Sequence, residues 1–260
     1  MSEPKLERRQ SSLKYKKQLH GHEKSLEDVA FKPGNAHMLC SVGVDRKVLV
    51  WDLRSGQQPV ITLREVHSSD INTVDWSKHD EWLLSTGSND TLVKLLDLRQ
   101  SGNPIISCLH KHKSKVDKVK FADFDRRYLA SSGDSLVFWD IQTDLAKLAG
   151  GTVQMPRDFD CGAFLTHTAD QCQCESQVLL SHIGHIGTVT DFDWNHLAPW
   201  TLISASDDSE PFNQIQRNNE SSLQIFRPLD LLVQNGGETA KGASEQQRPE
   251  LPPSDGSLKQ

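Results

Sequence analysis

The chain has 260 residues, of which 36 % are hydrophobic and 25 % are charged, so it can bury a core and is not disordered throughout. Its formal net charge of −6 excludes a protein that binds nucleic acid over its whole surface. Its longest apolar runs have four residues, whereas a membrane-spanning helix needs about twenty, so no membrane segment is expected. Five cysteines without a secretory-type N-terminal segment indicate reduced thiols, as in the cytosol or nucleus.

A repeat of about 45 residues runs through the chain. Its histidines His22, His67 and His112 lie 45 residues apart, and a fourth copy begins at His185. In every copy an aromatic residue follows the histidine after nine residues. The first three copies end in a hydrophobic residue followed by aspartate: Trp51-Asp52, Leu96-Asp97 and Trp139-Asp140. A Gly-His start, a Trp-Asp end and this period are typical of WD repeats.

The first copy shows the predicted elements. Short β-type segments occupy residues 26–31, 38–42, 47–51 and 58–63, with polar turns between them. Four strands per copy form one blade of a β-propeller, so the predicted fold is an all-β WD-repeat β-propeller with four recognisable blades. The predicted repeats cover residues 20–63, 64–109, 110–141 and 178–232, with an inserted loop at 142–177.

Two segments lie outside the repeats. Residues 1–19 are basic, and their alternating apolar residues could supply an outer strand for the last blade. Residues 233–260 are rich in Gln, Gly, Pro, Ser and Glu and are predicted to be a disordered tail.

Each repeat also carries the residue types of a hydrogen-bond chain. In the first copy these are His22, Ser41, Asp45 and Trp51. A buried polar chain is tolerable only when every member is satisfied, so this set is predicted to hold the hairpin turn and the strand register. The second copy has Leu96 instead of tryptophan, and the fourth has Asp208 followed by an insertion.

Several segments go beyond the general WD pattern, among them Leu26-Glu-Asp-Val, Ser85-Thr-Gly-Ser-Asn-Asp and Asp191-Phe-Asp-Trp-Asn. In them the chain resembles the C-terminal four blades of the retinoblastoma-binding, histone-chaperone WD-repeat family. The insertion after Asp208 is similar to that of the plant flowering-time regulator (FVE-type) subgroup. Because that family forms a seven-bladed ring behind an N-terminal helix, the resemblance implies a partial ring that lacks three blades and the helix.

The resemblance implies a non-enzymatic, nuclear subunit of chromatin assembly, histone deacetylase or Polycomb-type complexes that regulates transcription. Its expected partners are core histones and subunits of those complexes. The family holds a basic histone tail over the top opening of the ring. In each repeat, the residue four positions before the aromatic residue faces this opening. Here these positions are Glu27, Asn72, Asp117 and Thr190. Asp117 stands where the family has an aromatic residue, and Lys115 where it has an acid.

A generic WD scaffold, such as a cullin-RING ubiquitin ligase substrate receptor, is the alternative interpretation. Trp51-Asp52-Leu53-Arg54 fits the motif by which such receptors contact the ligase adaptor, with Asp52 and Arg54 as its polar residues. The segment from Leu96 to Arg99 is a degenerate copy. Ordinary blade architecture explains both segments more simply.

The residues favour neither an enzyme nor a metalloprotein. No Ser/His/Asp set stands in a nucleophile context and no glycine-rich phosphate loop occurs, so no catalytic site and no cofactor are expected. The Cys-x-Cys pair at Cys172 and Cys174 is too tight for a structural zinc site, so no metal is expected. The lysines between His110 and Lys120 are interpreted as a solvated loop, with no sequence-specific contact to nucleic acid.

Overall fold

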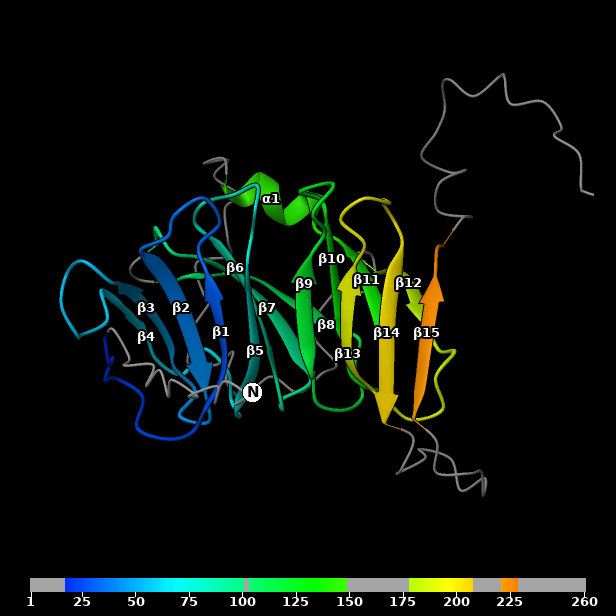
Figure 1. Ribbon diagram of the computed structural model, residues 1–260, viewed down its shortest axis with the longest axis horizontal. Helices are drawn as coiled ribbons and strands as arrows, with labels where there is room; N and C mark the ends of the chain where they lie inside the picture. Colours follow the sequence, from blue (N-terminus) through cyan, green and yellow to red (C-terminus); the bar gives the residue numbers. More distant parts are fainter. Residues whose placement is uncertain (1–16, 101–102, 149–177, 208–220, 229–260) are drawn as a thin grey trace, which may run out of the picture. The chain divides into compact units, whose positions relative to one another are not determined.

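The computed structural model describes residues 17–100, 103–148, 178–207 and 221–228. The described residues up to Arg227 belong to one compact unit, and Pro228 belongs to a second. Nearly all the regular structure in the first unit is antiparallel β-sheet (Figure 1), which confirms the predicted all-β WD-repeat fold.

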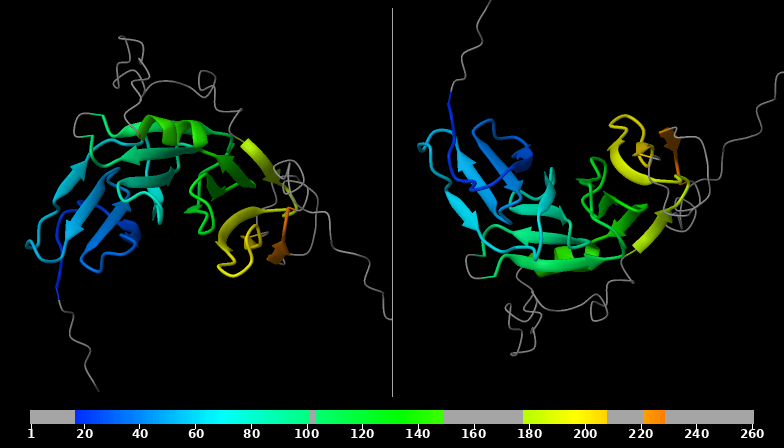
Figure 2. Two further views of the ribbon diagram at one scale, coloured as in Figure 1. Left: turned by 90° about the horizontal axis from the view of Figure 1, so that it is seen from above. Right: turned by 90° about the horizontal axis from the view of Figure 1, so that it is seen from below.

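Four sheets, here called blades 1 to 4, follow one another along the chain (Figure 2). Blade 1 contains β1 (Leu26–Phe31), β2 (Met38–Gly43), β3 (Val48–Asp52) and β4 (Ile61–Leu63). Blade 2 contains β5 (Ile71–Trp76), β6 (Leu83–Ser88), β7 (Leu92–Asp97) and β8 (Ile105–His110). Blade 3 contains β9 (Lys118–Phe121), β10 (Tyr128–Ser132), β11 (Leu136–Asp140) and β12 (Val178–His182). Blade 4 contains β13 (Thr188–Trp194), β14 (Leu202–Asp207) and β15 (Ser222–Phe226).

The core lies between successive blades rather than within one of them. Strand β1 contacts β5, β5 contacts β9, and β9 contacts β13. One apolar cluster joins blade 1 to blade 2 around Val50, Trp76 and Leu84, and another joins blade 2 to blade 3 around Leu95 and Phe121. Each sheet therefore buries both of its faces only when it has a neighbour on each side.

Two boundaries in the third repeat were predicted wrongly. The segment Val178–His182 pairs with β11 and completes blade 3, whereas the sequence-based division placed it in the fourth repeat. Residues 142–177 were predicted to be a loop, but Gln142–Leu148 form helix α1. Asp144 lies in the first turn of this helix, which packs near β8. The remainder of that insertion lies outside the described residues.

The predicted disordered tail and most of the basic N-terminal segment stay predictions. Residues 1–16 and 229–260 lie outside the described part of the chain. Lys17 donates a hydrogen bond to the Leu53 carbonyl, and the His20 amide donates to the Gln57 carbonyl, so residues 17–20 run along blade 1. Blade 4 has three strands among the described residues, and an outer strand from the N-terminal segment remains a prediction.

Candidate functional site

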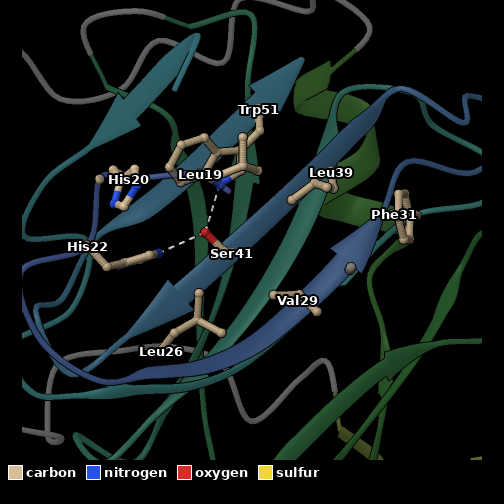
Figure 3. A pocket seen from close by; sticks show the side chains of 11 residues that line it. Leu19, His20, His22, Leu26, Val29, Phe31, Leu39, Ser41 and Trp51 are labelled. Atoms are coloured by element: carbon tan, nitrogen blue, oxygen red, sulfur yellow. Dashed lines mark hydrogen bonds between the residues drawn. The ribbon is translucent and has the colours of Figure 1, made fainter. Parts of the chain in front are cut away.

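The structure brings together the four polar residues predicted for blade 1, and Figure 3 shows three of them, His22, Ser41 and Trp51. Trp51 Nε1 donates to Ser41 Oγ at 2.8 Å, and Ser41 Oγ lies 2.8 Å from His22 Nε2. His22 Nδ1 lies 2.9 Å from Asp45 Oδ1. Because indole is only a donor and an ionised carboxylate only an acceptor, the chain runs in one direction from Trp51 to Asp45.

Asp45 also holds the hairpin turn between β2 and β3. Its carboxylate accepts the amides of Glu23 and Lys47, and Arg46 beside it adopts a left-handed φ of 59°. Asp90 and Thr91 repeat this turn in blade 2, with a φ of 71° at Thr91. The aspartate thus ties the histidine at the start of the repeat to a turn 23 residues later in the sequence.

The same chain continues in the other blades with changes. In blade 2 the imidazole of His67 joins Asp90 to Thr86, and Leu96 fills the tryptophan position. Blade 3 has the full set, listed here: His112, Ser131, Asp134 and Trp139. In blade 4 His185 contacts Ser204 and, through Nδ1, Ser222. Asp208, predicted for that place, lies outside the described residues.

The blade-2 pair is the most deeply buried. Burial lowers the pKa of His67, although its contact with Asp90 opposes this change. Burial by itself raises the pKa of Asp90, but hydrogen bonds from His67 and from the Ser68 and Leu92 amides outweigh it and bring the pKa to about 2. The pair therefore has a structural role, since neither side chain is exposed enough to contact a substrate.

Three of the four positions predicted for the top face share a backbone feature. The register of β1 with β2 shifts between Leu26 and Asp28, which makes Glu27 the extra residue of a β-bulge. Asn72 and Thr190 are the extra residues of the equivalent bulges in blades 2 and 4. Asp117 directly precedes β9. Bulges redirect side chains out of the ladder, so the same backbone irregularity directs the side chain at this position away from the sheet in three blades.

The chemistry of these four positions differs sharply. Glu27 is exposed and makes no ion pair within the described ranges. Asn72 Nδ2 donates to Asn89 Oδ1 and to the Val116 carbonyl, both at 2.8 Å. Asp117, by contrast, forms an ion pair with Lys115 at 2.8 Å, and Thr190 donates to the Ala205 carbonyl. Glu27 is therefore the one uncommitted carboxylate among the four.

Asp75, at the junction of blades 2 and 3, is a half-buried acid that the sequence analysis missed. It accepts the Phe121 amide at 2.8 Å. Burial raises its pKa to about 6, although Phe121 and the charge of Lys120 pull the other way. In the sequence, Asp75 differs from other acids only by its place on the inner strand. The alternation of side chains along a strand predicts which residues face a neighbouring blade, but it does not predict how deeply they are buried.

Asp75 is expected to make the protein less stable as the pH rises from about 4 to 6. In this window the folded chain binds a proton that the unfolded chain, with a carboxyl pKa near 3.8, has released, so folding is favoured at the acid end. Asp75→Asn should flatten this slope and raise the free energy of unfolding at pH 7 by about 1 kcal/mol. Urea titrations at several pH values measure both; an unchanged slope would contradict this role of Asp75.

The polar residues of the alternative ligase motif lie at the opposite end of blade 1 from Glu27. Asp52 pairs with Met38 in the register, whereas Glu27 lies beside the Leu26–Gly43 pair. Asp52 and Arg54 form a double hydrogen bond to each other at 2.7 and 3.0 Å. Hydrogen bonds from Arg54 bring the pKa of Asp52 to about 2. The Arg54 side chain remains largely exposed.

Nothing in the described residues adds a metal or membrane site. No group of three or more His, Cys, Asp or Glu residues there is placed to hold a metal ion. Cys172 and Cys174 lie outside the described ranges. Cys40 and Cys108, which are described, are both buried. Across the same residues, no helix has the length and apolar character required to cross a bilayer.

Comparisons with known proteins agree with this geometry. Residues 13–52 and 57–97 match the family "WD domain, G-beta repeat". The WD-40 repeat-containing protein MSI4 of Arabidopsis thaliana is 35 % identical over 229 residues, which is 82 % of this chain and 38 % of MSI4. MSI3 of the same plant is 31 % identical over 189 residues, which is 73 % of this chain and 41 % of MSI3. The chain thus spans about two fifths of the length of these relatives.

These matches confirm the resemblance drawn from the motifs, and they support a scaffold that works through protein–protein interaction. They point to no catalytic family. The chain therefore contains WD repeats, and it is similar to the WD-repeat proteins represented by MSI4 and MSI3.

Proposed function

We propose that this chain is a non-enzymatic, histone-binding scaffold of nuclear chromatin-modifying complexes, of the chromatin-assembly, histone deacetylase or Polycomb type. Similarity to two MSI proteins and the top-face bulges support this proposal. The ligand is a basic tail of a core histone, and the other partners are subunits of those complexes.

The observation that carries the proposal is the state of Glu27. A bulge sets its carboxylate outside the β1–β2 ladder, where it is exposed and has no cationic partner among the described residues. Such a carboxylate can accept a charge-assisted hydrogen bond from lysine, or a double one from arginine. Asn72, held through its amide nitrogen, keeps its carbonyl oxygen as an acceptor beside it on blade 2.

Blade 3 offers the tail much less. Lys115 neutralises Asp117, and Lys118 and Lys120 lie 3.9 and 2.5 Å from Asp191 and Asp193 of blade 4. A basic peptide meets ion pairs already formed there. The tail is therefore expected to lie over blades 1 and 2.

Substitutions of Glu27 and Lys115 test this assignment. Glu27→Gln should weaken the binding of a histone tail peptide, whereas Lys115→Glu should strengthen it, because it replaces a repelling charge with an attracting one. Each change at such a partly exposed site is worth roughly 1–2 kcal/mol, or about tenfold in affinity. Isothermal titration calorimetry at two salt concentrations measures both effects, and binding should weaken as salt increases.

Asp52→Asn is the matched control, since it removes the same charge at the opposite end of blade 1. It should leave peptide affinity unchanged. If neither Glu27→Gln nor Lys115→Glu altered the dissociation constant, the top face would not be the histone site.

The exposed guanidinium of Arg54 keeps the ligase-receptor alternative open to test. Under that alternative the chain would co-purify with a cullin ligase adaptor, and Arg54→Ala would abolish the association. Under the histone proposal Arg54→Ala leaves peptide affinity unaltered.

A further inference from the structure

The top face carries a carboxylate on blade 1 and a carboxamide on blade 2, and the two groups differ in what their rotation changes. Glu27 offers an acceptor oxygen whichever way its carboxylate turns. Asn72, at the equivalent bulge, offers either an oxygen or an N–H group, depending on how its carboxamide is rotated. The orientation of the Asn72 carboxamide therefore decides whether blade 2 can bind a hydrogen-bond donor of a ligand.

A hydrogen-bond relay of four residues surrounds this carboxamide. Asn72 Nδ2 donates to the Val116 carbonyl and to Asn89 Oδ1, both at 2.8 Å. Asn89 Nδ2 in turn lies 3.4 Å from Asp70 Oδ2. The main-chain amide of Asn89 also donates to the Asp70 carbonyl, at 3.0 Å. The relay thus connects β5 with the loop before it, with the β6–β7 turn and with the start of blade 3.

The direction of the relay is set at both of its ends. A carbonyl oxygen and an ionised carboxylate only accept hydrogen bonds, so Val116 and Asp70 both require an N–H donor. Turning either carboxamide around would place oxygen against oxygen at one end. With the relay complete, both N–H groups of Asn72 are used, and its Oδ1 accepts no hydrogen bond within the described residues.

Blades 1 and 3 do not have the side chains for such a relay. The position of Asn89, directly before the aspartate of the hairpin turn, is Val44 in blade 1 and Gly133 in blade 3. At their top-face positions these blades have the carboxylates of Glu27 and Asp117. A carboxylate presents an oxygen without being held, so the relay is found in the blade whose group depends on orientation.

We propose that Asn89 is a positioning residue of the top-face site, which holds the Asn72 carboxamide so that blade 2 binds an N–H donor of the ligand. The inference rests on the proposed function, because the ligand is the basic tail of a core histone. Such a tail has N–H donors in its lysine and arginine side chains and along its main chain. A group that only accepts hydrogen bonds would face the lone pairs of Asn72 Oδ1 and be rejected.

Asn89 acts through Asn72 and not by contact with the tail. Both ends of the Asn89 carboxamide are engaged within the chain, the oxygen by Asn72 and the nitrogen by Asp70. Holding the Asn72 side chain in its binding orientation before the tail arrives also reduces the conformational entropy that binding has to remove.

A double-mutant cycle tests this role. Asn72→Ala and Asn89→Ala should each weaken the binding of a histone tail peptide about three- to tenfold, the change that corresponds to one neutral hydrogen bond. Neither substitution alters the net charge. Adding Asn89→Ala to Asn72→Ala should cause no further loss, because Asn89 then has nothing to position. Isothermal titration calorimetry on the full chain measures the four dissociation constants. Additive losses would overturn the proposal, since Asn89 would then contact the tail itself.

Asn35→Ala is the matched control for Asn89→Ala. Asn35 lies between β1 and β2, at the opposite end of blade 1 from Glu27, where it accepts the His37 amide. Its substitution should leave peptide affinity unchanged. The Asn89 side chain is exposed, so Asn89→Ala is expected to fold, and urea unfolding verifies this for every variant.

Nuclear magnetic resonance measures the orientation of Asn72 without any peptide. In the ¹⁵N-labelled parent chain, both protons on Asn72 Nδ2 should be protected from exchange with water. In Asn89→Ala the proton that faced Asn89 should lose its protection, while the proton that faces Val116 keeps it. Two unprotected protons in the parent would overturn the proposal.

The two measurements separate this inference from the proposed function. A parent chain that binds no peptide would contradict the proposed function and, with it, the role of Asn89 in tail binding. A parent chain that binds the peptide no more tightly than Asn89→Ala does would contradict the role of Asn89 alone.

Discussion

Replacing Trp76 with alanine is expected to lower the free energy of unfolding by about 3–5 kcal/mol. Trp76 is among the largest fully buried side chains, and it packs in the cluster between blades 1 and 2 with Val50 and Leu84. Its indole nitrogen also donates to the Glu81 carbonyl at 2.9 Å. The substitution removes apolar contact, leaves a cavity and takes away that carbonyl's donor. Urea unfolding of the variant and the parent measures the loss.

Phe31 provides a matched control for Trp76. It occupies the same repeat position in blade 1 but is exposed. Phe31→Ala should therefore change the free energy of unfolding by less than about 1 kcal/mol. Comparable losses in the two variants would show that Phe31 is covered as Trp76 is, which would contradict this prediction.

Replacing Asp45 with alanine is expected to cost about 1–3 kcal/mol of stability. The carboxylate partners His22 Nδ1 and the amides of Glu23 and Lys47, and alanine would leave the buried histidine nitrogen without an acceptor. The hairpin turn would lose its side-chain support at the same time. Thermal or urea unfolding of the variant and the parent at pH 7 measures the difference.

The pH dependence of this effect has a definite sign. Burial raises the pKa of Asp45, but the Glu23 amide and His22 outweigh it, and the pKa lies below its ordinary value. The stability that the carboxylate contributes is therefore present above about pH 4 and is lost as the pH falls through the lower folded-state pKa. Asp45→Ala and the parent should converge in acid. Glu27→Ala, an exposed acid on the same blade, should alter stability by no more than about 0.5 kcal/mol at any pH. An Asp45→Ala variant as stable as the parent at pH 7 would rule out a supporting role for the chain.

The sequence by itself determined the repeat and what is local to it. The spacing from histidine to aromatic residue, the aspartate of the hairpin turn and the short alternating segments depend on neighbours within one blade, so each copy can be identified alone. The four blades and the chain from His22 to Trp51 could be predicted for this reason. The sequence did not show that β12 belongs to blade 3, because a long insertion separates it from β11. The entropic cost of closing a loop grows only slowly with its length, so a strand distant in sequence can complete a sheet.

Only the tertiary structure decided what depends on the adjoining blade. Trp76 and Phe31 follow the same pattern, yet one is buried and the other exposed, because burial requires a second sheet against the face. Asp75 has an elevated pKa because blade 3 closes over it. Lys115 lies against Asp117 and neutralises it, whereas Glu27 stays free after its bulge, and neither the pairing nor the bulge is visible in the repeat spacing. These properties arise from groups on different strands and blades, whose distances a linear pattern does not contain.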